Sequence, residues 1–74
     1  MRKYLEAVEI PPPDAGEGYV AEFIRIDVTD KDLDTALSDL KELLSPDKKY
    51  VVRIHYCYHD EDPKKPCKLE VLNI

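Results

Sequence analysis

One amphipathic segment limits the architecture more than any other feature of this sequence. Between residues 33 and 44, apolar side chains recur at the i, i+3, i+4 and i+7 spacing of one helix face. The residues between them are polar and are expected to face water. The segment therefore predicts one α-helix that buries a single face, made of Leu33, Ala36, Leu37, Leu40, Leu43 and Leu44.

The ends of this helix also carry sequence signals. Thr29 or Asp30 is the expected N-cap, since a side-chain oxygen there can accept from the first free backbone N–H groups. Asp32 and Asp34 follow, where negative charge is favourable near the positive end of the helix dipole. Ser45-Pro46 ends the helix, because the residue before a proline avoids helical geometry.

The rest of the chain predicts strands. Pro11-Pro12-Pro13 ends the first strand, because prolines donate no backbone hydrogen bond, and a proline- and glycine-containing connector follows. The sequence YVVRIHYCY is dense in the β-branched and aromatic residues that favour strands. The expected strands cover residues 2–9, 19–28, 49–58, and 67 to 72 or 74.

This order predicts a single α+β domain over residues 1–74, with ββαββ order and a four-stranded, mainly antiparallel sheet. A helix about 10 Å across cannot cover four strands spaced about 4.8 Å apart. Part of the sheet is therefore expected to stay uncovered. The residues expected on the uncovered face, as a candidate interface, are Phe23, Arg25, Val51 and Arg53.

The last two strands predict a hairpin register. Placing Tyr58 opposite Cys67 puts Leu69 and Val71 on the same face as Val52, Ile54, Tyr56 and Tyr58. A shift by one residue would move Leu69 and Val71 beside Arg53 and His55. The first register is therefore expected, and it sets Glu70 opposite His55 as an exposed cross-strand pair.

Composition excludes several classes of protein. The net charge of −5 argues against generic nucleic-acid binding, which needs basic residues against phosphates. The N-terminal residues form neither a signal peptide nor a membrane span, so we expect a cytoplasmic protein with both of its cysteines reduced. Charged residues make up 36% of the chain and glutamine is missing, a pattern that leans toward a thermophilic source.

The chemistry-bearing residues cluster on the third strand. His55, Cys57 and His59 occupy alternate positions of the strand and would share a face, and Cys67 lies across the loop. Cysteine and histidine are the usual ligands of zinc, so these residues are a candidate zinc site. The predicted register argues against this site, because it turns Cys67 to the other face. The three strand residues would also span about 13 Å, too far for one ion without a bulge. Most strands with such residues are plain surface strands.

Catalysis is not expected. Cys57 has two neighbouring histidines as candidate bases, but we identify no orienting carboxylate and no oxyanion hole in the sequence. The tyrosines could stack on RNA bases, but Tyr56 and Tyr58 are expected on the helix-covered face.

The sequence leaves three functions open. The first is a non-enzymatic module, without a cofactor, that docks a protein partner or a second copy (a homodimer) through the uncovered face. That face mixes aromatic, aliphatic and arginine side chains, as interface cores do. The alternative is a small zinc-binding protein using His55, Cys57 and His59. A third, weaker reading is an acidic inhibitor or nucleic-acid mimic.

Overall fold

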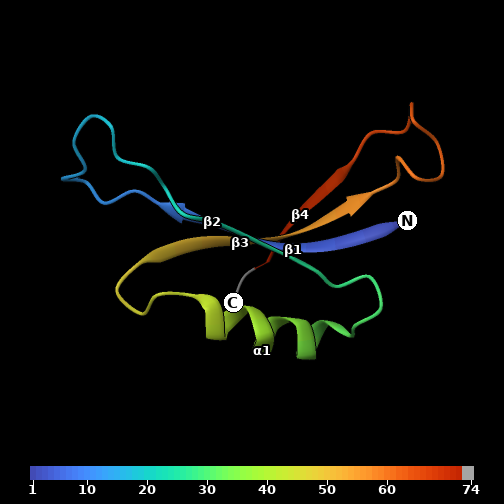
Figure 1. Ribbon diagram of the computed structural model, residues 1–74, viewed down its shortest axis with the longest axis horizontal. Helices are drawn as coiled ribbons and strands as arrows, with labels where there is room; N and C mark the ends of the chain where they lie inside the picture. The colour runs from blue at the N-terminus through green and yellow to red at the C-terminus, as the bar shows by residue number, and fades with distance from the viewer. Residues whose placement is uncertain (73–74) are drawn as a thin grey trace.

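The computed structural model describes residues 1–72, which fold in the expected ββαββ order as one α+β unit. Figure 1 shows the helix on one side of an open, twisted sheet. The first strand is one residue longer than expected, and the second is shorter. The last strand was predicted to end at residue 72 or 74, and residues 73–74 lie outside the described residues. The elements are β1 (Arg2–Ile10), β2 (Phe23–Asp27), α1 (Leu33–Leu43), β3 (Lys49–Cys57) and β4 (Lys68–Leu72).

The sheet has the order β2-β1-β3-β4, and every neighbouring pair is antiparallel. β1 therefore lies between β2 and β3, while β2 and β4 form the edges. Because β2 and β3 both run antiparallel to β1, α1 belongs to a connection between two parallel strands. This crossover brings the helix back across β1, the strand against which it mainly packs.

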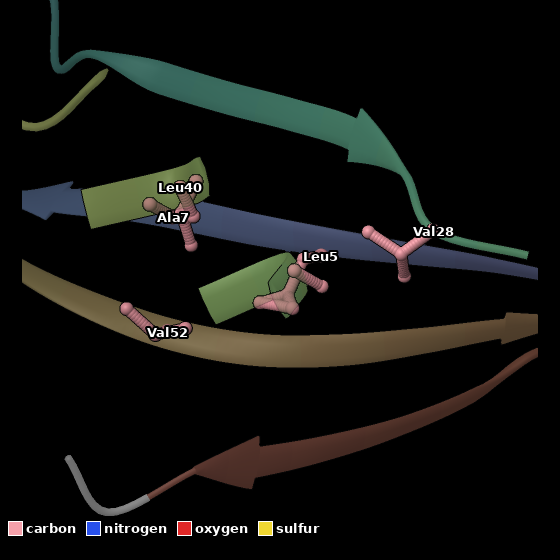
Figure 2. Close-up of a cluster of buried hydrophobic side chains, with 6 residues drawn as sticks. Leu5, Ala7, Val28, Leu40 and Val52 are labelled. Carbon is pink, nitrogen blue, oxygen red and sulfur yellow. The ribbon is translucent and has the colours of Figure 1, made fainter. Parts of the chain in front are cut away.

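The core lies between α1 and one face of the sheet. Leu5 and Ala7 of β1 meet Ala36 and Leu40 of α1, and all four side chains are fully buried. Figure 2 shows Leu40 near Ala7, with Val28 beyond the end of β2 and Val52 on β3. This helix-covered face is small, as expected for one helix over four strands.

The N-terminal end of the helix differs from the prediction. The cap is Asp32, whose Oδ1 accepts a 2.8 Å hydrogen bond from the backbone N–H of Thr35. The prediction that Thr29 or Asp30 caps the helix was therefore wrong. Thr29 instead accepts from the backbone N–H of Lys3 at 3.1 Å, which ties the β2–α1 connection to β1.

In the part of the chain that the structure describes, no helix is long and apolar enough to cross a membrane.

The register of β4 also differs from the prediction. His55 lies opposite Leu69 and Arg53 opposite Val71, so Leu69 and Val71 face away from the helix. Glu70 lies opposite Ile54, and the predicted pairs Glu70–His55 and Tyr58–Cys67 were wrong.

The position of the helix gives the physical reason for this register. α1 packs mainly on β1, so the helix side of the edge strand β4 offers little apolar surface. The observed register instead turns Leu72 toward Val52, where Leu72 is partly buried against the core.

Candidate metal-binding site

The uncovered face, opposite α1, carries all four residues of the predicted interface. Arg25 and Arg53 lie on either side of Glu6, and Phe23 and Val51 lie on either side of Val8. The face is therefore assembled from β2, β1 and β3 in layers across the sheet. Its central layer is ionic.

Glu6 is the centre of this layer and has no exposed surface. Its carboxylate accepts hydrogen bonds from Arg53 Nε at 2.7 Å and Arg25 Nε at 2.9 Å, and lies 2.9 Å from His55 Nδ1. Burial acts to raise the pKa of Glu6, but the hydrogen bonds from His55, Arg53 and Arg25 outweigh it, and the pKa lies below its usual value. Glu6 is thus held as a buried carboxylate.

This carboxylate fixes the chemistry of His55. With Nδ1–H donating to Glu6, the lone pair of a neutral ring is on Nε2. Nε2 is buried and has no hydrogen-bond partner among residues 1–72. A buried polar atom without a partner is uncommon in folded proteins, because it loses its hydrogen bonds to water and gains no hydrogen bond within the protein. Here it is a free ligand atom.

Two thiols lie close to the ring of His55. The β3–β4 register, continued by one residue, sets Cys57 opposite Cys67 on the uncovered face. The ligand atoms of His55, Cys57 and Cys67 all lie within 4.8 Å of one another. The prediction that Cys67 points to the opposite face from Cys57 was therefore wrong, and with it the main argument against a metal site.

His59 also lies against the two sulfurs. β3 ends at Cys57, and the chain then turns instead of continuing as a strand. This turn brings His59 Nδ1 to 3.3 Å from Cys57 Sγ and 3.4 Å from Cys67 Sγ. The expected 13 Å span, which assumed an extended strand, does not apply. His55, Cys57, His59 and Cys67 are called the thiol–imidazole cluster below.

The two thiols differ electrostatically. Hydrogen bonding by the backbone and ring of His59 lowers the pKa of Cys57. Burial raises the pKa of Cys67, and the neighbouring Cys57 raises it further. Cys57 is thus the sulfur that more readily becomes a thiolate, which is the form that binds metals.

The spacing of the cluster suits a tetrahedral ion. Bonds of about 2.3 Å to sulfur and 2.0–2.1 Å to nitrogen put neighbouring ligand atoms about 3.4–3.8 Å apart. The two contacts of His59 Nδ1 with the sulfurs, 3.3 and 3.4 Å, are already close to this range. The ligand atoms of His55, Cys57 and Cys67 are more widely spaced, at up to 4.8 Å from one another.

Sequence reasoning named all four members of the cluster, although it placed Cys67 on the wrong face, and it missed the residue behind them. Glu6 lies between Leu5 and Ala7, two core residues, and so resembles an ordinary exposed position of an alternating strand. What distinguishes it is the pair of arginines opposite it on β2 and β3. That signal requires the strand order, which the sequence does not state.

Comparison with protein-family models, with curated proteins and with solved structures found no match for this chain.

Proposed function

We propose that this protein binds one zinc ion through the thiol–imidazole cluster. The observation that supports this best is His55 itself: its Nε2 is buried and has no partner among residues 1–72, its Nδ1 contacts a buried carboxylate, and its ligand atom lies within 4.8 Å of two cysteine sulfurs. Zinc ligands of this type commonly use one ring nitrogen for the metal and the other for a carboxylate. The arrangement supplies both features from different strands.

The donor set favours zinc over harder cations. Two cysteine sulfurs and two imidazole nitrogens form a set that is typical of tetrahedral zinc, whereas magnesium and calcium prefer oxygen ligands. Four protein ligands would leave no open coordination position for a substrate or water. The proposed role is therefore structural rather than catalytic.

An ion here would join three segments. His55 and Cys57 lie at the end of β3, His59 in the turn after it, and Cys67 just before β4. A chain of 74 residues has a thin core, for which a bound metal is a common staple. Metal binding that occurs only in the folded state adds directly to the free energy of unfolding.

The test is to measure metal content and thermal stability of the protein purified without chelator. We expect one zinc per chain by native mass spectrometry, and a melting temperature that falls when EDTA removes it. Cobalt substitution should give the intense absorption of thiolate-bound, tetrahedral Co²⁺.

Point variants assign the ligands. Cys57→Ser, Cys67→Ser and His55→Ala should each abolish tight zinc binding, while His59→Ala tests the fourth ligand. Lys64→Ala is the matched control, because Lys64 is exposed in the same loop. Zinc content and melting temperature that are the same in Cys57→Ser, Cys67→Ser and the control would refute the proposal.

Partner docking through Phe23, Arg25, Val51 and Arg53, the function expected first from the sequence, stays a prediction. Phe23 and Val51 are exposed, at 51% and 38%. Both arginines, however, form ion pairs with Glu6, which partly satisfies their charge within the chain. Zinc binding has the more specific support.

A further inference from the structure

The outer edge of β4 is a second feature that the proposed zinc site does not use. β4 is an edge strand, and Lys68, Leu69, Glu70 and Val71 are all exposed. Leu69 and Val71 are 51% and 62% exposed on the uncovered face. An edge strand with free backbone groups and exposed apolar side chains is a template for pairing with another strand.

The side chains of β4 are complementary to a second copy of themselves. When two β4 strands pair antiparallel about a two-fold axis, residues with numbers of the same parity lie opposite each other. With Leu69 on the axis, Lys68 of each copy lies opposite Glu70 of the other, which makes two opposite-charge pairs. With Glu70 on the axis, the two glutamates would face each other and repel. The charges thus favour one register.

The other edge is less suited to self-pairing. β2 carries Arg25 and Asp27, but Arg25 pairs with Glu6 at 2.9 Å and Asp27 accepts from Thr29 at 2.7 Å. Their charges are therefore already used within the chain. Among residues 1–72, no ion pair involves Lys68 or Glu70.

Packing two uncovered faces against each other is also disfavoured. At the centre of that face the single charge of Glu6 is opposed by both Arg25 and Arg53, which leaves a local excess of positive charge. Stacking two copies face to face would bring these excesses together. Side-by-side pairing through β4 keeps them apart and joins the Leu69 and Val71 side chains of both copies into one apolar strip.

We propose that β4 pairs with β4 of a second copy, with Leu69 on the two-fold axis, to form a dimer with a continuous eight-stranded sheet. A second copy of the chain is the proposed partner because the charges of β4 are complementary to those of another β4. The inference goes beyond zinc binding and does not depend on it. Each copy would keep its own thiol–imidazole cluster.

Analytical ultracentrifugation of the full chain, with EDTA and separately with zinc, tests the proposal. We expect a dimer under both conditions. Lys68→Glu and Glu70→Lys should each raise the dimer dissociation constant roughly tenfold, because each creates two like-charge pairs. The double swap Lys68→Glu/Glu70→Lys restores both pairs and should return the constant to within about threefold of the original.

The control is Glu42→Lys, the same charge change on an exposed helix residue, which should leave dimerisation unaltered. Circular dichroism checks that each variant folds. A monomeric protein at millimolar concentration would overturn the proposal, as would single variants no weaker than Glu42→Lys. A double swap that stays monomeric would overturn the register. A dimer seen only with zinc would overturn the whole proposal, because metal bridging between copies would then explain the association.

Discussion

The fully buried carboxylate of Glu6 lies 2.9 Å from Nδ1 of His55, across the β1–β3 strand pair. This contact links the ionic centre of the uncovered face to the thiol–imidazole cluster. It occupies Nδ1 of the imidazole ring and leaves Nε2 without a partner among residues 1–72, in a ring that lies close to the two sulfurs.

Glu6→Gln should weaken zinc binding about 10- to 100-fold, the usual effect of losing a carboxylate behind a metal-bound histidine. It should also lower the free energy of unfolding by about 1–3 kcal/mol, because the hydrogen bonds to Arg25 and Arg53 lose their charge. Chelator competition gives the affinity, and urea denaturation in EDTA gives the stability. Glu42→Gln, on the exposed side of α1, is the control. Unchanged zinc affinity in Glu6→Gln would contradict the role given to this carboxylate.

Leu40→Ala should lower the free energy of unfolding by about 2–5 kcal/mol, because Leu40 is fully buried against the sheet and leaves a cavity. Leu43→Ala is the matched control on the same helix. Leu43 is 53% exposed, so its replacement should cost well under half as much. Chemical denaturation of both variants measures the difference, and equal losses would show that the core has been placed wrongly.

Asp32→Ala should lower the free energy of unfolding by about 0.5–2 kcal/mol, since it removes the N-cap hydrogen bond to Thr35. Asp30→Ala, at the cap predicted from the sequence, should have a much smaller effect. Thermal unfolding followed by circular dichroism distinguishes the two positions. The reverse order of effects would mean that the helix starts earlier than residue 33.

Glu22 predicts a loss of stability in acid. Hydrogen bonds from the Tyr50 hydroxyl and from Lys48 hold the pKa of Glu22 below its usual value. A lowered folded-state pKa stabilises the fold above the unfolded pKa of about 4.3, and this contribution is lost as pH falls through the folded pKa. Glu22→Gln should therefore lose less stability than the original protein between pH 7 and pH 3. Denaturant midpoints at both pH values test this, and parallel losses would contradict it.

The sequence predicted what depends on local pattern. The apolar spacing over residues 33–44 located α1, and the β-branched run after Lys49 located β3. The choice of Asp32 as N-cap was missed because Thr29, Asp30 and Asp32 are all acceptable cap residues. The side-chain oxygen of Thr29 accepts instead from the backbone N–H of Lys3, 26 residues away in the sequence, and the side chain of Asp32 caps the helix.

The prediction failed where distant coverage matters. The predicted register of β4 assumed that Leu69 and Val71 face the helix. In the structure α1 packs mainly on β1. Of Leu69, Val71 and Leu72, only Leu72 lies on the helix side of β4. Cys67 was misplaced for the same reason. No local pattern tells which strands of a sheet a helix will cover.

The central position of β1 has a consequence for how this chain reaches its native state. β1 is synthesised before the other three strands, yet one of its two neighbours, β3, begins only at Lys49, 39 residues after β1 ends at Ile10. The β1–β2 hairpin can form early, but two-stranded hairpins are marginal in water. The β3-facing edge of β1 and the apolar side chains of Leu5 and Ala7 must wait for partners from later segments. Such long-range pairing slows folding, and a hairpin that waits with an open edge and exposed apolar side chains favours aggregation.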